Sequence, residues 1–256
     1  MKYVEKHPMS LLLVGILGIS VSAIFVRYSD APSAVTAAYR MLWTVLFLTP
    51  AVFGSPALRR ELLQVDRRSL LLSLASGAFL AAHFVLWFES LQYTSVASST
   101  TIVCTEVIWV SLGYCLFLKG RIGIKAAAAI AVALVGSILI AWSDSGSGAH
   151  LYGDILAWLA AVSTALYTLI GQVLRKRMST TVYTYLVYAS CGFILLVTCA
   201  VQRHNLFGFG PSTPLVGLAL ALLSTIMGHS IFSCSLTTSA CRSVSSFCIT
   251  LLKLLK

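Results

Sequence analysis

Long apolar runs separated by short polar connections are the feature that most constrains how this chain can fold. A membrane span needs about 20 mostly apolar residues, and we place eight at Met9–Val26, Ala34–Phe53, Ser69–Phe88, Val96–Leu118, Ala126–Trp142, Leu151–Leu174, Val182–Val201 and Pro214–Cys234. Only 10% of the residues are charged, whereas soluble domains average about 25%. Because a soluble fold would lack the polar surface to cover itself, we predict an all-α polytopic membrane protein.

The positive charges fall unequally on the two sides of these spans. Twelve lie on one side and two on the other; the first set is Lys2, Lys6, Arg59, Arg60, Arg67, Arg68, Lys119, Arg121, Lys125, Arg175, Lys176 and Arg177, and the second is Arg27 and Arg203. Cytoplasmic loops carry the excess of Lys and Arg. We therefore expect a multi-pass protein of the plasma membrane, or of the inner membrane if bacterial, with a cytoplasmic N-terminus. No cleavage pattern follows the first span, so we expect it to be retained.

The polar segment Ser143–His150 divides the chain after five spans. An odd number of spans before this point starts the second half on the opposite side of the membrane, as in the inverted repeats of transporters. We predict an inverted-repeat bundle with a first repeat of five helices at residues 1–144. A partial second repeat of three helices would follow at 145–234, and an atypical tail at 235–256. A bundle of eight helices without an internal repeat is the alternative.

Three stretches carry recognisable patterns: AAYRMLWTVLFLTP (Ala37–Pro50), LWFESLQYTSVASSTTIVCTEVIWVSL (Leu86–Leu112) and GDILAWLAAVSTALYTLIGQVLRKR (Gly153–Arg177). In this order they resemble the second span, the hairpin of the third and fourth spans, and the start of the second repeat in the EamA-like family of the drug/metabolite transporter superfamily. The resemblance extends to about Cys234. It implies ten helices in two inverted five-helix repeats that move small metabolites. Val107 stands where the family usually has the proline that kinks its fourth span.

Glu106 is an acid inside an otherwise apolar span. It lies about ten residues beyond Val96, which at 1.5 Å per residue is roughly 15 Å deep and close to the bilayer midplane. A charge there costs on the order of 2.5–3.5 kcal/mol. Ser99, Glu106 and Gly113 recur every seven residues and share one narrow face. We predict that Glu106 faces a cavity and serves in coupling or substrate binding; a protonated glutamate bonded to a neighbouring helix is the alternative.

Further site candidates lie in the spans around Glu106. Arg40 could pair with Glu106, bind an anionic group of the substrate, or snorkel outward. His83 and Trp87 are one turn apart at a similar depth, so we expect them to flank the outer mouth of the cavity together with Arg40. Aromatic residues that could line the cavity, or simply pack in the core, are Tyr39, Trp109 and Tyr167.

Small residues inside the spans predict close contacts between helices, and we assign Gly77, Gly136 and Ala126–Ala129 to such contacts. The seven cysteines include no CxxC pair, and the chain has neither a Walker sequence nor GxGxxG. We expect no cofactor and no metal. The dispersed basic residues indicate no nucleic-acid partner.

The resemblance implies a secondary transporter of small metabolites, and by family analogy an exporter, not an enzyme. A small-molecule substrate and the lipid bilayer are the expected partners, and a homodimer is left open. One alternative is a transport-inactive membrane protein, because the tail SLTTSACRSVSSFCITLLKLLK (Ser235–Lys256) does not resemble a ninth span. That tail could be out of frame or belong to a short variant. A membrane enzyme acting on a lipid-linked substrate is a second alternative.

Overall fold

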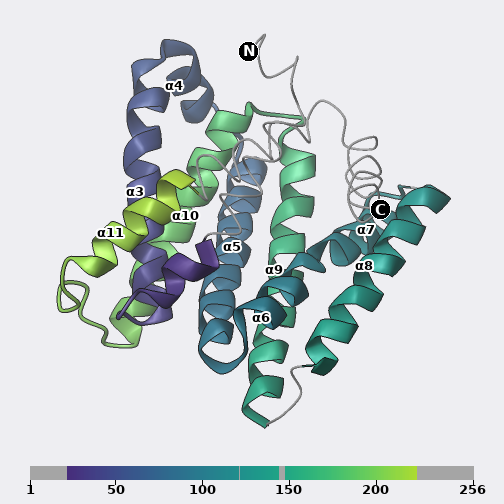
Figure 1. Cartoon of the computed structure of the whole chain (residues 1–256). Helices are drawn as coiled ribbons and strands as arrows, with labels where there is room; N and C mark the ends of the chain where they lie inside the picture. The colour runs from purple at the N-terminus through teal and green to yellow at the C-terminus, as the bar shows by residue number, and fades with distance from the viewer. Residues whose placement is uncertain (1–21, 121, 144–147, 224–256) are drawn as a thin grey trace.

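The computed structural model describes residues 22–120, 122–143 and 148–223, and this part of the chain contains helices and no strand. Its elements are α3 (Ser33–Gly54), α4 (Pro56–Leu63), α5 (Arg67–Tyr93), α6 (Val96–Cys104), α7 (Glu106–Phe117), α8 (Ile124–Ser143), α9 (Gly148–Leu174), α10 (Thr180–Val201) and α11 (Ser212–Ala219), as Figure 1 shows. Most of the predicted first span, the end of the eighth and the whole tail from Ser235 lie outside the described residues.

Five helical segments in the described residues are long and apolar enough to cross a bilayer. They are Ser33–Gly54, Arg67–Tyr93, Val96–Phe117, His150–Leu174 and Thr180–Val201. These agree with the second, third, fourth, sixth and seventh predicted spans to within a few residues at most ends. Of two shorter apolar helices, Ala127–Leu139 falls within the predicted fifth span and Ser212–Leu223 overlaps the predicted eighth. The chain is an all-α polytopic membrane protein.

The helix α4 was not predicted, because its eight residues are too short and too polar for a span. It begins at Pro56. The first amides of a helix have no partner within the helix, so the missing N–H of proline costs no hydrogen bond there. The helix ends at Leu63, and Gln64 is its C-terminal cap. None of its side chains is buried. Figure 1 shows α4 at the end of the bundle between α3 and α5. It turns the chain from one span into the next at the membrane surface.

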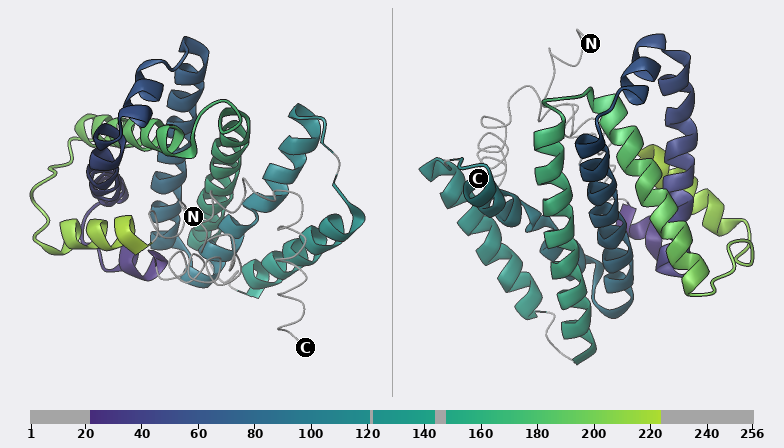
Figure 2. Two further views of the ribbon diagram at one scale, coloured as in Figure 1. Left: turned by 90° about the horizontal axis from the view of Figure 1, so that it is seen from above. Right: turned by 180° about the vertical axis from the view of Figure 1, so that it is seen from behind.

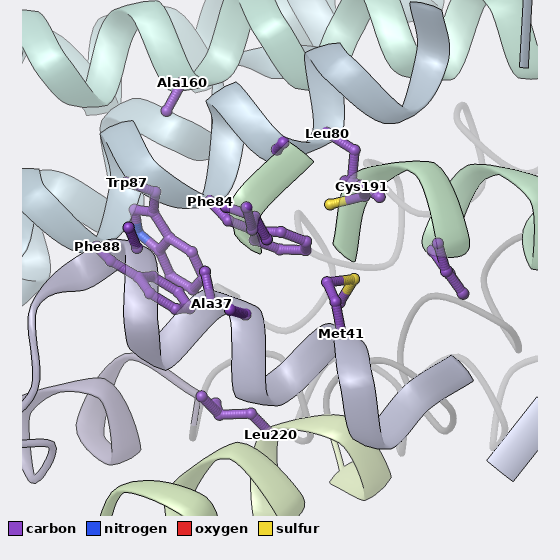
Figure 3. Close-up of a cluster of buried hydrophobic side chains, with 14 of the residues drawn as sticks. Ala37, Met41, Leu80, Phe84, Trp87, Phe88, Ala160, Cys191 and Leu220 are labelled. Carbon is purple, nitrogen blue, oxygen red and sulfur yellow. The ribbon is translucent and has the colours of Figure 1, made fainter. Parts of the chain in front are cut away.

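The centre of the bundle is α5, which packs along α9 and against α10 and α3. The two views of Figure 2 show these four helices side by side, with α11 against α3 and α8 at the opposite flank beside α7. The close-up in Figure 3 shows where α3, α5 and α10 meet, with Met41, Phe84 and Cys191 turned toward one another. All three are fully buried. Apolar packing on α5 therefore organises the described helices.

The two glycines predicted to mediate helix contacts differ in their surroundings. A Cβ added at Gly77 would lie 2.8 Å from the Val187 carbonyl oxygen and 3.0 Å from the Cys191 backbone nitrogen, so α5 and α10 touch backbone to backbone there. A Cβ added at Gly136 in α8 would meet no atom within 4 Å in the described part of the chain. Within the described residues Gly136 thus lacks the predicted contact, because residue size alone does not tell a helix-facing position from a lipid-facing one.

The turn between α5 and α6 is held by the start of α9. Asp154 Oδ1 accepts hydrogen bonds from Thr94 Oγ1 at 2.9 Å and from Ser98 Oγ at 3.1 Å. A Cβ on Gly153 would lie 2.8 Å from the Thr94 nitrogen, so only glycine allows this approach. The Gly-Asp pair and the LQYTSV turn, some 60 residues apart in sequence, thus form one contact that positions α6.

Candidate transport site

The fourth span is broken in the middle, between α6 and α7. The Thr105 amide and the Thr105 Oγ1 hydroxyl both donate to the Ile102 carbonyl, at 3.0 and 2.7 Å. In a continuous α-helix this carbonyl would accept from the amide of Glu106. A threonine side chain that bonds back to its own helix is a known cause of bending. Glu106 consequently becomes the first residue of α7, and the span is interrupted without a proline.

Glu106 lies at this interruption and faces α9. The residue is half-buried, and the Thr164 side chain on α9 is its polar neighbour. The first turn of a helix also presents amide groups and the positive end of the helix dipole, which favour a carboxylate. The acid thus has a polar neighbour on the next helix and a favourable position on its own.

A small apolar cavity of about 130 Å³ lies between α7 and α9, one turn beyond Glu106. Trp109, Gly113 and Leu116 line it from α7, and Val162 and Leu166 from α9. The ring of Trp109 packs edge-on against Trp158 with centroids 5.4 Å apart. Its indole Nε1 is buried and has no hydrogen-bond acceptor in the described structure. Trp109, one of the predicted aromatic lining residues, therefore borders a cavity in the described part of the chain.

Arg40, His83 and Trp87 lie together in the core between α3, α5 and α9. Arg40 is fully buried, with its guanidinium carbon 4.3 Å from the ring centre of Phe84, so it does not snorkel outward. His83 Nδ1 is 3.0 Å from the Ala160 carbonyl oxygen. Because a carbonyl only accepts, Nδ1 carries the proton. The His83 ring stacks on Trp87 at 5.9 Å and lies within electrostatic range of Arg40.

Tyr167, on α9, belongs to a buried polar group that reaches α5 and α10. Its carbonyl oxygen accepts from Ser76 Oγ at 3.4 Å and from Tyr183 OH at 3.5 Å, and these two hydroxyls are 2.7 Å apart. Tyr188, also on α10, lies within electrostatic range of both Tyr167 and Arg40. The sequence analysis missed Ser76, Tyr183 and Tyr188, although the tyrosine-rich TTVYTYLVY run at the start of α10 was a signal for them.

Tyr39 lies apart from the other candidates. Its hydroxyl donates to the Leu206 carbonyl at 2.9 Å, which ties α3 to the connection between α10 and α11. In the described structure Arg40 and Glu106 form no ion pair, and Tyr188 and Cys191 lie within electrostatic range of Arg40. The candidates therefore form two groups, one around Arg40 and His83 and one around Glu106 and Trp109.

The helix α9 connects these two groups. The helix carries three residues spaced four and three apart: Ala160, whose carbonyl bonds His83, Thr164, the polar neighbour of Glu106, and Tyr167. That spacing places them on one stripe of a helix. A displacement of α9 would therefore act on both groups at once, which the sequence pattern did not indicate.

Comparison with known proteins agrees with this architecture. The chain is 26% identical over 197 residues to the uncharacterized transporter YxxF of Bacillus subtilis (strain 168), covering 76% of this chain and 60% of that protein. The match thus spans about three fifths of the relative's length. A solved crystal structure shares the fold, with a TM-score of 0.64 and 14% sequence identity over 96% of this chain and 88% of the other.

The family comparison covers the spans that contain Arg40, His83 and Glu106. Residues 7–142 match the EamA-like transporter family, which is more than half of the 256 residues. Together with the broken fourth span and the membrane-spanning helices, this match shows that the chain belongs to the EamA-like transporter family.

Proposed function

We propose that this protein is a secondary transporter that exports small metabolites and that Glu106 is its coupling group. The main observation in support is the interruption of a membrane span at Thr105, which makes Glu106 the first residue of α7. Discontinuous helices with polar groups near the midplane form the substrate and ion sites of many secondary transporters. An ionisable side chain at this depth is costly in the bilayer and is therefore a functional candidate by default.

In this proposal the group around Arg40 recognises the substrate. A guanidinium keeps its charge at any working pH and can bind a carboxylate or phosphate through two parallel bonds. His83, Trp87 and Tyr167 would contact the remaining polar and aromatic parts, and Trp109 would border the route next to Glu106. Tyr39 would contribute indirectly by holding the α10–α11 connection. No cofactor is required.

Alternating access would arise from movement of two inverted repeats, at residues 1–144 and 145–234. Because α9 bonds His83 through the Ala160 carbonyl and places Thr164 next to Glu106, it would transmit movement between the two groups. A second copy of the chain could complete the pathway. In this proposal the first repeat supplies Arg40, His83 and Glu106, and the second repeat supplies Tyr167 and the rest of α9.

The proposal is tested by reconstituting the purified chain into vesicles that carry a proton gradient. Labelled amino acids, organic acids, amines and nucleobases would each be supplied, and accumulation would be compared with protein-free vesicles. We expect one class to be transported. No transport of any class by a protein with native helical content would support a transport-inactive protein. Chemical conversion of a lipid-linked compound, detected by mass spectrometry, would instead support an enzyme.

We also predict that the N-terminus and the α4 end of the bundle lie in the cytoplasm. In a variant with all seven cysteines replaced, Gln64→Cys and Asn205→Cys place single thiols at exposed positions at opposite ends. A membrane-impermeant maleimide added to intact cells should label position 205 and not position 64. Both should react after the cells are opened. The reverse pattern in intact cells would contradict the proposed orientation.

A further inference from the structure

Six exposed cationic side chains gather at one end of the bundle, on two segments that are far apart in the sequence. We call them the basic patch; its members are Arg59, Arg60, Arg67, Arg68, Lys176 and Arg177. The first four lie on α4 and at the start of α5, and the last two in the turn between α9 and α10. Figure 1 and the rear view in Figure 2 both place α4 and the α9–α10 turn at the same end.

Two contacts hold these segments next to one another. The Ser179 amide, at the start of α10, donates to Glu61 Oε1 of α4. Asp66, at the start of α5, lies within electrostatic range of Arg177, and α4 also packs on α10. The basic patch is therefore one surface defined by the fold, and not two unrelated loops.

The carboxylates within the patch are already engaged. Glu61 accepts the Ser179 amide, and Asp66 Oδ2 accepts the Ser69 amide at 3.0 Å as the cap of α5. The hydrogen bonds from Ser69, with a smaller contribution from Arg177, lower the pKa of Asp66, so this cap stays ionised. Two structural carboxylates against six exposed cations leave a clear positive excess. Arg175 is not part of the patch, because its Nε donates to the Gly171 carbonyl and its guanidinium lies 5.8 Å from the Tyr183 ring.

Exposed apolar side chains border the patch and locate it relative to the bilayer. Phe53 at the end of α3 is 48% exposed, Leu63 at the end of α4 is 79% exposed, and Leu71 near the start of α5 is 55% exposed. In a membrane protein such side chains face hydrocarbon. Because the arginines are within a few residues of these positions, we place them at the depth of the lipid headgroups.

We propose that the basic patch binds the phosphate of an anionic phospholipid and that this lipid joins the α4–α5 segment to the α9–α10 turn. The guanidinium fork matches two phosphate oxygens, and clustered basic residues beside a membrane span are attracted to acidic lipids. A headgroup held between the two segments would reinforce the Glu61–Ser179 contact. The inference concerns the folded protein in its membrane and does not depend on the proposed transport function.

The test compares the purified protein in nanodiscs of phosphatidylcholine with nanodiscs of equal parts phosphatidylcholine and phosphatidylglycerol. We expect a higher melting temperature with phosphatidylglycerol, and phosphatidylglycerol retained in native mass spectra. The double variant Arg59→Gln/Arg60→Gln should lose this rise while melting normally in phosphatidylcholine. Retention of the lipid should fall about fivefold per removed charge. Arg67→Gln/Arg68→Gln provides a second, independent pair on α5.

Lys125→Gln is the matched control, since Lys125 is an exposed cation in α8, outside the patch; it should keep the full effect of phosphatidylglycerol. Equal melting temperatures of the unmodified protein in both lipids would overturn the proposal. The proposal would also be overturned if phosphatidylglycerol raised the melting temperature of both double variants as much as that of the unmodified protein. Glycerol 3-phosphate in solution should not reproduce the rise; if it does, the patch is a site for soluble phosphate compounds and the assignment to lipid is wrong.

Discussion

Replacing Glu106 by glutamine should abolish substrate accumulation driven by a proton gradient. Glutamine has nearly the same shape and can still hydrogen-bond with Thr164, but it cannot take up or release a proton. If Glu106 couples transport to protons, Glu106→Gln vesicles should accumulate no more substrate than protein-free vesicles. Exchange of labelled for unlabelled substrate, which needs no net proton movement, should continue. The measurement is gradient-driven uptake and exchange on the same preparation.

Glu89→Gln is the control for this experiment. Glu89 is another carboxylate within a membrane-spanning helix, but it lies near the end of α5, where it accepts a hydrogen bond from Ser33 Oγ at 2.7 Å. Its substitution should leave gradient-driven accumulation in place. Unchanged accumulation in Glu106→Gln would contradict the coupling role. Loss of exchange as well as accumulation would assign Glu106 to substrate binding.

Replacing Gly77 by valine should strongly destabilise the described bundle. The new Cβ would lie 1.8 Å from Ser190 Oγ, which can rotate away, but also 2.8 Å from the Val187 carbonyl oxygen and 3.0 Å from the Cys191 nitrogen, which cannot. The central helix α5 and α10 would have to separate. Overpacking of this kind typically costs about 1–3 kcal/mol, and we expect the upper end because backbone meets backbone.

The measurement is the melting temperature of the purified protein in detergent, which should fall by roughly 5–10 °C for a chain of this size. Gly136→Val is the matched control, with the same substitution at a glycine whose Cβ would meet nothing within 4 Å in the described residues. It should change the free energy of unfolding by about 0.5 kcal/mol or less, as surface substitutions do. If the melting temperature fell equally in the two variants, the helix propensity of valine, and not the α5–α10 contact, would account for the loss of stability.

These two glycines illustrate the limit of sequence interpretation in a membrane protein. In a soluble helix, hydrophobic periodicity separates the buried face from the exposed face. Lipid is as apolar as a protein core, so that signal is weak in a span, and a small residue can face either a helix or lipid. Gly77 and Gly136 are therefore equivalent in the sequence, and only the packing of α5 on α10 distinguishes them.

The break at Thr105 shows the same limit at the candidate site. A valine in place of the family's proline removed the usual reason to expect a kink at Glu106. Threonine is common in spans, and its hydroxyl bonds back to the helix in many of them without ending it. The break depends on which carbonyl accepts the hydrogen bonds of the Thr105 hydroxyl and amide, and the local backbone geometry decides this.

By itself, the sequence determined the all-α membrane class and the approximate positions of the five spans found among the described residues. The reason is that bilayer thickness imposes a fixed apolar length on every span, and this constraint is local along the chain. Only the tertiary structure decided that Arg40 is buried beside Phe84 and His83, that Thr164 is the partner of Glu106, and that Tyr39 lies apart. It also placed α4 next to the α9–α10 turn. These contacts join residues far apart in sequence, and they depend on how the helices rotate and cross, which the apolar pattern of a single span does not encode.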